Sequence, residues 1–517
     1  MTDALRGVDD EGLPVIPPPR VRGDHTRGLA GLAGLGVGLS VGRKVLMLVY
    51  SVLFVRLLGV DLYALFVAFD TVARPLGTVG AVGGANVLIK EISEARAQGN
   101  ERRARHVILS SLILILLVSG AIAAIVSIEA PTIARWMGGL PYLESLLRVG
   151  SAYIVLLALM TALTGALTGY GRTAAMFTLT NGVEPMFKLL GLPVVALLLV
   201  WVPAHWPWVI VPEMLSMVAV LALGAFYLRR DSAFAVRPSL ELPGEILRLT
   251  STGIPLLVHS LSSIAFTYAD RAMVASMIGD ALSLSAYSIT VTLSLLLILF
   301  HRNLVTAVSP AVSAAVAAND RARLVKIYRD SSAASFILAG TGYLLLLIFG
   351  REVLAAYDPR FSACLMLIGV MAWGHLVDTF AGCGGYLLIA RGKGRYLMYN
   401  SIGTVALNIV MNYYFIRWYG LTGAAAATAL SYVAKNLIIM IQNYMTDRIH
   451  PISRLHALNF VLAAAGAVLL WDVSETVSLP WRLLLGTGVA AGGMAMLWVA
   501  FPDSATPFLR RLRKRRP

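Results

Sequence analysis

The sequence predicts an all-α polytopic membrane protein with about 14 transmembrane helices, arranged as two parallel six-helix bundles plus two additional C-terminal helices. Three observations predict this fold class. Hydrophobic residues make up 58% of the 517 residues and charged residues 14%, so the chain has more apolar surface than a soluble core can bury. The apolar residues fall into segments long enough to cross about 30 Å of hydrocarbon. Landmarks of the first half also recur in the second half at a nearly constant spacing.

The apolar segments divide the chain into regions. Residues 1–28 are polar and proline-rich and are expected to form a disordered cytoplasmic tail. We expect the first six-helix bundle over 29–230, a cytoplasmic linker over 231–250 and the second bundle over 251–446. Two more helices follow within 457–501, and 502–517 form a basic cytoplasmic tail. The predicted helices span 32–58, 62–89, 107–128, 146–169, 175–201, 209–228, 251–278, 284–316, 332–350, 363–390, 397–416, 421–445, 457–474 and 482–501.

Basic residues predict the orientation of these helices. Most Lys and Arg of the connections lie on the side that also holds both tails, which places both termini in the cytoplasm. The outer connections are short, so we expect no extramembrane catalytic domain. They carry Arg135, Arg351, Arg360, Arg417 and Arg482.

The spacing of small and polar landmarks predicts the repeat. Gly59 matches Gly279, Asn100 matches Asn319, and Gly171-Arg172 matches Gly394-Arg395. Each half holds an even number of helices, so both halves start on the same side and are parallel repeats about an axis along the membrane normal. Such halves can rock about a site held between them, which is the basis of alternating access.

Composition argues against several other classes. The net charge of +15 is scattered over loops and does not form one face with aromatic platforms, so nucleic-acid binding is not expected. Cys364 and Cys383 lack CxxC spacing and a histidine pattern, so we expect small core residues and neither a metal nor a cofactor.

Three motifs resemble those of a known family. The stretch FVRLLGVDLY at 54–63 is similar to the signature that ends the first helix of bacterial polysaccharide flippases of the Wzx type, although Ala64 stands where that family usually has Gly. The stretch WYGLTGAAAAT at 418–428 is similar to the start of their twelfth helix. Further matching residues are Asp270-Arg271, Gly279, Ala286-Tyr287 and Val308-Ser309-Pro310.

The resemblance covers about residues 30–445. It implies the multidrug/oligosaccharidyl-lipid/polysaccharide exporter superfamily, with two six-helix bundles in a V around a central cavity. In its flippase branch it implies translocation of undecaprenyl-diphosphate-linked oligosaccharides across the bacterial cytoplasmic (inner) membrane for exopolysaccharide, capsule or O-antigen of lipopolysaccharide. Expected partners are this substrate, membrane lipids, a polysaccharide polymerase and export machinery. By analogy with lipid II flippases, the last two helices would form a groove for the lipid tail, and a packing role stays open.

Charged side chains inside the apolar segments mark the predicted substrate site, because an uncompensated ion near the bilayer centre costs about 2.5–3.5 kcal/mol. Carboxylates are fewer than cations, which favours an anionic substrate such as a diphosphate. The cations are Arg43, Lys44, Arg74, Lys188, Arg271, Arg302 and Lys435, and the carboxylates are Asp70, Glu184, Glu213, Asp270 and Asp378.

The spacing leaves a second interpretation open for several of these residues. Asp70 with Arg74, and Glu184 with Lys188, lie four residues apart on a helix and can form structural ion pairs. Pro75 and Pro185 could instead open these helices toward a cavity. The remaining cations could make interhelical bonds or reach the membrane interface.

Two histidine–carboxylate pairs are candidates for proton coupling. His259 and Asp270 share a helix face, and His375 lies one turn from Asp378. The alternative is that these histidines are hydrogen-bonded structural groups.

Four rival functions remain. A cation-coupled multidrug exporter, such as an antiporter, would need a carboxylate-rich, aromatic cavity, and a lipid II flippase would share the anionic substrate class. A membrane glycan polymerase or ligase would need an outer loop with catalytic residues or a cytoplasmic domain. A scaffold would not need charge at membrane depth.

Overall fold

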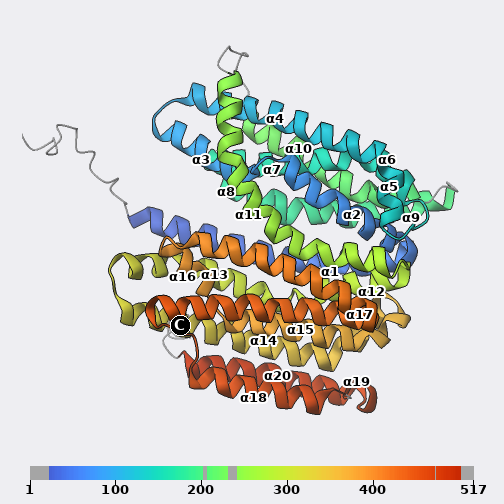
Figure 1. The fold of residues 1–517 in the computed structure, drawn as a ribbon, viewed down its shortest axis with the longest axis vertical. Helices are drawn as coiled ribbons and strands as arrows, with labels where there is room; N and C mark the ends of the chain where they lie inside the picture. The colour runs from blue at the N-terminus through green and yellow to red at the C-terminus, as the bar shows by residue number, and fades with distance from the viewer. Residues whose placement is uncertain (1–22, 202–205, 231–241, 472, 502–517) are drawn as a thin grey trace, which may run out of the picture.

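The structure is a computed structural model that describes residues 23–201, 206–230, 242–471 and 473–501. All regular secondary structure in these ranges is helical (Figure 1). The first half contains α1 (Gly23–Leu58), α2 (Val60–Gly80), α3 (Gly84–Ala97), α4 (Glu101–Ile128), α5 (Ala130–Trp136), α6 (Leu143–Gly150), α7 (Ala152–Gly169), α8 (Thr173–Thr178), the π-helix η1 (Leu179–Val183), α9 (Glu184–Trp201), the 3₁₀-helix η2 (Trp206–Ile210) and α10 (Val211–Arg230).

The second half is longer. It contains α11 (Leu242–Met277), α12 (Ala281–Ser294), α13 (Leu297–Ala317), α14 (Arg321–Tyr357), the 3₁₀-helix η3 (Pro359–Cys364), α15 (Leu365–Phe380), α16 (Gly384–Ala390), α17 (Gly394–Asp447), α18 (Arg454–Leu470), α19 (Val473–Thr476) and α20 (Leu479–Ala500). Two predicted spans lie within α17, where Gly420 has non-helical angles (φ 60°, ψ −135°) that separate them.

The predicted fold class is confirmed. Ten helical segments of the described residues are long and apolar enough to cross a membrane, and each of the fourteen predicted segments overlaps helical residues in the described ranges. Several predicted spans are broken helices. The span predicted at 62–89 consists of α2 and α3, and the span predicted at 284–316 consists of α12 and α13.

At the break between α2 and α3, the backbone of the turn contacts the backbone of α11. Val82, Gly83 and Gly84 have positive φ angles of 47°, 81° and 55°. A Cβ atom on Gly83 would lie 2.6 Å from the Cα of Gly253 in α11, so a larger residue would push the two segments apart. The turn therefore fixes α11 against the first bundle.

The helices form two bundles. In Figure 1, α2–α10 form the upper bundle, α12–α17 the lower one, and α1 runs along the boundary between them. The helices α18 and α20 pack on α14, at the far side of the lower bundle.

The helix α11 links the two bundles. It packs against α2, α3 and α4 of the first bundle and against α17 of the second. It begins at Leu242, inside the stretch predicted as a linker, while residues 231–241 lie outside the described residues. The expected boundary at 251 is therefore not where the helix starts, and α11 is shared between the bundles.

The structure supports the repeat and corrects two of its landmarks. Gly59 and Gly279 have similar φ angles, 89° and 75°. The residue that matches the N-cap Asn100 is Asp320, because each side chain accepts a bond from the backbone N–H three residues later.

The residue that matches the third landmark is also corrected. Gly171 and Gly392 precede α8 and α17 with φ angles of 77° and 73°. The sequence match to Gly394-Arg395 was therefore two residues too late. With both corrections the landmark spacings agree to within one residue.

Candidate functional site

Charged side chains inside the first bundle form a network of ion pairs that joins α1, α9 and α10. Arg43 of α1 has its Nη2 atom 3.3 Å from Glu184 Oε1. The same Glu184 oxygen lies 2.8 Å from Lys188 Nζ, which confirms the pair predicted from helical spacing. Lys188 also lies 2.7 Å from Oε2 of Glu213 in α10, and its side chain is 2% exposed. Lys188 is therefore compensated by two carboxylates, and its surroundings do not support the predicted contact with an anionic substrate.

The helix bearing this network is irregular. The π-helix η1 directly precedes Glu184, and Pro185 follows it. A π-helical turn leaves an extra residue in the helix, and such turns occur often at functional sites. The helix is therefore irregular next to Pro185, and the predicted opening toward a cavity stays a prediction.

The predicted pair of Asp70 and Arg74 joins three helices. Arg74 Nε donates to Asp70 Oδ1 over 2.9 Å. Tyr153 of α7 donates to Asp70 over 3.3 Å, and Tyr268 of α11 donates to it over 3.4 Å. The pair lies at the position where α11 crosses the first bundle, so it is a structural link between α2, α7 and α11.

Asp270 is held by neutral donors. Its oxygens accept a bond of 2.7 Å from Asn412 Nδ2 and one of 2.5 Å from Thr428 Oγ1. The Thr428 hydroxyl lies 3.2 Å from the hydroxyl of Tyr287. Asp270 is 3% exposed, and among the described residues no Lys or Arg lies within ion-pair distance of it. The side chain of His259, its predicted relay partner, lies outside the described residues.

Sequence reasoning missed the partners of Asp270, although the sequence carries a signal for them. Polar residues recur at every fourth position on one face of α17, and all of them are buried. A polar stripe in an apolar helix predicts a packed polar interface. The stripe consists of Asn400, Thr404, Asn408 and Asn412.

Lys435 pairs with the carboxylate of Asp378. Its Nζ atom lies 2.8 Å from Asp378 Oδ1, to which Asn436 also donates over 2.7 Å. The ring of His375 packs against Tyr432, with centroids 4.6 Å apart. The predicted contact between His375 and Asp378 is thus replaced by bonds from Lys435 and Asn436.

Three predicted cations have no carboxylate partner in the described part of the chain. Lys44 and Arg302 are exposed, and Arg271 lies over the ring of Tyr268 at 5.4 Å. Lys44 of α1 lies within electrostatic range of Arg43 and of Arg302 in α13. Of these three cations, Arg43 is paired with a carboxylate.

Lys44 and Arg302 lie deep in their apolar helices. Lys44 precedes the end of α1 at Leu58 by about 21 Å, given the rise per residue of an α-helix. Arg302 precedes the end of α13 at Ala317 by about 22 Å. Charge at this depth requires a polar or hydrated surrounding.

The bundles are joined at one end. Arg56 Nε and Nη2 donate to the backbone oxygens of Ala356 and Ala355, both over 2.7 Å. The Ser51 hydroxyl lies 2.9 Å from the hydroxyl of Tyr357, and Ser285 donates to the backbone oxygen of Val60 over 3.1 Å. Within the described ranges, these are the hydrogen bonds that connect the first bundle directly to α12–α17. All lie at the end that the orientation rule places outside.

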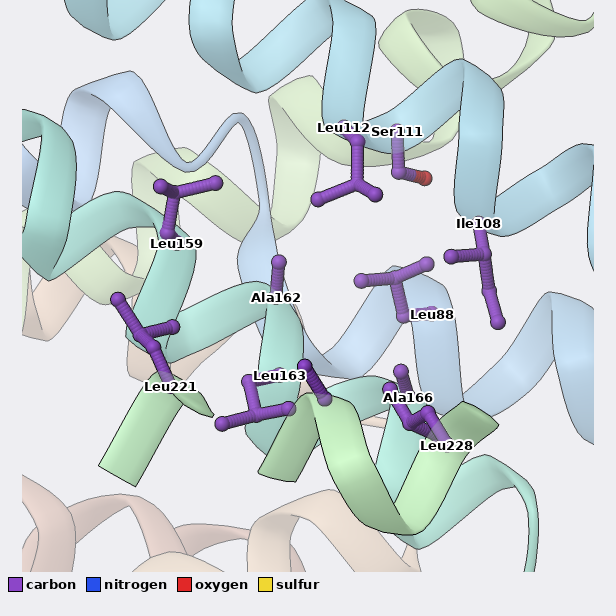
Figure 2. Close-up of a pocket in the computed structure, with 11 residues that line it drawn as sticks. Leu88, Ile108, Ser111, Leu112, Leu159, Ala162, Leu163, Ala166, Leu221 and Leu228 are labelled. Atoms are coloured by element: carbon purple, nitrogen blue, oxygen red, sulfur yellow. The ribbon is translucent and has the colours of Figure 1, made fainter. Parts of the chain in front are cut away.

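An apolar cavity of about 220 Å³ lies within the first bundle, between α3, α4, α7 and α10. Figure 2 shows its leucine and alanine side chains together with the hydroxyl of Ser111. The lining has no charged group, so a diphosphate has no partner there. This cavity is distinct from the charged boundary between the bundles.

Comparisons with known proteins agree on the family. The family model described as polysaccharide biosynthesis protein matches residues 36–316, which is more than half of the chain, and the MatE model matches 255–414. The probable low-salt glycan biosynthesis flippase Agl15 of Haloferax volcanii is 21% identical over 224 residues, 43% of this chain and 46% of that protein. The matches span about half the length of the curated relatives.

Solved structures show the same fold. The lipid II flippase MurJ, in an inward closed conformation, aligns with a TM-score of 0.66 and 14% identity over 91% of this chain and 99% of that chain. An inward-facing multidrug resistance MATE family transporter aligns with a TM-score of 0.59 and 15% identity over 86% and 96%. The chain therefore belongs to the polysaccharide biosynthesis protein family, and its fold is that of the MurJ and MATE structures.

Proposed function

We propose that this transporter is a flippase that moves polyprenyl-diphosphate-linked oligosaccharides across the bacterial cytoplasmic membrane, for exopolysaccharide, capsule or O-antigen synthesis. The family match and the similarity to a glycan flippase support this substrate class. In this proposal both termini are cytoplasmic, and the two bundles are the units that rock against each other. A polymerase and export machinery would take up the product.

The observation that carries the proposal is the excess of positive charge at the boundary of the bundles. Three carboxylates inside the apolar helices are paired with cations: Asp70 with Arg74, Glu184 with Lys188, and Asp378 with Lys435. Asp270 accepts hydrogen bonds from neutral donors. Lys44 and Arg302 are exposed and, among the described residues, neither has a carboxylate partner. Diphosphate oxygens would accept charge-assisted hydrogen bonds from both side chains, and the polyprenyl tail would remain in lipid.

The contacts at the outer end support alternating access. Arg56, Ser51 and Ser285 bind the bundles together there, and in this state the substrate would reach Lys44 and Arg302 from the cytoplasmic side. Outward release would require these few hydrogen bonds to break, each contributing about 0.5–1.5 kcal/mol. That cost is small enough for binding of a charged head group to offset it.

A cation-coupled multidrug exporter is the second candidate. Asp270 favours it, because a buried carboxylate held by Asn412 and Thr428 could exchange a neutral donor for a cation. The match of residues 255–414 to the MatE model also favours it. A lipid II flippase is a third candidate on the basis of fold alone.

Translocation in proteoliposomes tests the proposal. We would measure the flipping of a labelled polyprenyl-diphosphate oligosaccharide, of lipid II and of a cationic drug, with and without an ion gradient. We expect flipping of the oligosaccharide lipid, reduced at least about tenfold in Arg302→Ala and in Lys44→Gln, since each removes a charged hydrogen-bond donor. Arg271→Ala is tested in the same way.

The control is Lys326→Gln, because Lys326 is exposed on α14 and outside the site. Unchanged flipping in all three variants would remove these residues from the site. Transport of the drug without transport of any lipid-linked sugar would establish the second candidate instead.

A further inference from the structure

A polar pocket lies at the ends of α13, α16 and α17 in the second bundle, and its lining includes neither Lys44 nor Arg302. Its volume is about 680 Å³, and it forms where the connections α13–α14, α16–α17 and α17–α18 meet. Each connection contains a residue with positive φ: Asn319 at 51°, Gly392 at 73° and Arg448 at 55°. These turns direct the ends of the three connections toward one point. The charged residues of the lining are Asp320, Arg321, Arg391, Lys393, Asp447 and Arg448.

Both carboxylates of the pocket already have partners. Asp320 caps α14, because its Oδ1 atom accepts a bond of 2.9 Å from the backbone N–H of Arg323. Asp447 forms an ion pair with Arg391, whose side chain is 10% exposed. The lining therefore holds four cations against two carboxylates, which leaves an excess of positive charge.

Neutral groups hold the remaining three cations in place. Arg321 Nη2 donates to the backbone oxygen of Asp447 over 3.2 Å, and Lys393 Nζ donates to Thr446 Oγ1 over 3.1 Å. The guanidinium of Arg448 lies over the ring of Tyr444 at 5.1 Å. In the described part of the chain none of the three pairs with a carboxylate. Each retains unused N–H donors, which suit an anion with several oxygens.

The rest of the lining indicates where this anion comes from. The lining also contains the apolar residues Val316, Leu324 and Ile449, near the points where α13 and α17 end and α14 begins. A basic pocket between helices at the membrane surface suits the head group of an anionic lipid better than a freely soluble ion, because acyl chains remain in the bilayer beside it. We propose that this pocket binds the phosphate-bearing head group of a lipid of the adjacent leaflet. This site does not depend on the identity of the transported substrate.

The test is a binding measurement on the full chain in neutral detergent. Native mass spectrometry would give the affinity for cardiolipin, phosphatidylglycerol, phosphatidylcholine, undecaprenyl diphosphate and inorganic pyrophosphate. The variant carries Arg321→Gln, Lys393→Gln and Arg448→Gln. We expect its affinity for the anionic lipids to fall at least about tenfold, since each basic side chain contributes to binding at an anionic surface.

The matched control carries Arg323→Gln, Lys326→Gln and Arg454→Gln, which remove the same charge from exposed residues outside the pocket. We expect less than a twofold change there. Lys393→Gln alone serves if the triple variant does not fold, with an expected loss of about fivefold.

Each outcome decides the proposal. An equal loss in the variant and in the control would show diffuse surface attraction and overturn it. Pyrophosphate binding as tightly as the lipids would overturn the lipid assignment. Preference for either cardiolipin or undecaprenyl diphosphate supports the site and identifies the lipid that supplies the phosphate. Because this experiment measures lipid binding, its result does not depend on whether the protein translocates the proposed substrate.

Discussion

Lys188 and Lys44 lie in the same half of the chain and show two uses of a lysine at membrane depth. Lys188 is 2% exposed between Glu184 and Glu213, and it ties α9 to α10. Lys44 is exposed, has no carboxylate partner among the described residues and lies within reach of Arg302. Depth alone does not separate them. The difference is the presence of an acid on a neighbouring helix, which makes one charge structural and leaves the other available.

The largest expected effect comes from removing the structural lysine. Lys188→Met would leave the buried Glu213 without its cation and Glu184 with Arg43 alone, and we expect a loss of about 3–5 kcal/mol in the free energy of unfolding. Thermal unfolding in detergent measures it. Lys44→Met is the control, with an expected change within about 0.5 kcal/mol. Equal effects of the two substitutions would break the comparison.

The next effect concerns the carboxylate held by neutral donors. Asp270→Ala would leave the amide of Asn412 and the hydroxyl of Thr428 without their acceptor, at an expected cost of about 1–3 kcal/mol. Asp270→Asn keeps one acceptor oxygen and should cost less. The melting temperatures of the two variants check this order. If Asp270→Asn were the more damaging change, the negative charge itself would be required, which would sharpen the case for a cation at this position.

A smaller effect is expected at the contact between the bundles. Arg56→Gln removes two bonds to the backbone oxygens of Ala355 and Ala356, so the state open at this end should gain about fivefold to tenfold in population. The labelling rate of Ser285→Cys, in a background with Cys364→Ser and Cys383→Ser, reports this opening. Arg148→Gln is the control, because Arg148 pairs with Glu144 inside the first bundle. Equal labelling rates in the Arg56 and Arg148 variants would contradict a latching role.

The smallest effect on stability is expected from reversing the free charge. Lys44→Glu would place a carboxylate within reach of Arg302 and Arg43, and an exposed pair contributes about 0–1 kcal/mol. Stability should hardly change, while flipping of an anionic lipid should fall below that of Lys44→Gln. Parallel unfolding and proteoliposome measurements separate the two readouts. Flipping equal to that of the wild type would show that the charge of Lys44 is not used.

Local spacing was sufficient for a large part of the fold and for some of the site. Apolar segments of spanning length predicted the helices, and the four-residue spacing predicted the pairs of Asp70 with Arg74 and of Glu184 with Lys188. These inferences succeed because each depends on residues that one helix brings together. The helix break at Leu295–Leu296 was not predicted, since it lies in continuous apolar sequence. The break at Val82 was not predicted either, because the Gly83-Gly84 that follows it also fits the interior of a membrane helix, where glycine is frequent.

The tertiary structure alone decided which charges are compensated. Glu213 reaches Lys188 from α10, and Asn412 and Thr428 reach Asp270 from α17. The amino-acid sequence determines that this membrane protein carries charge at membrane depth, because charged residues occur within apolar segments of spanning length. Which cation meets an acid depends on how helices from distant parts of the chain are packed, and a one-dimensional pattern carries no distance between them.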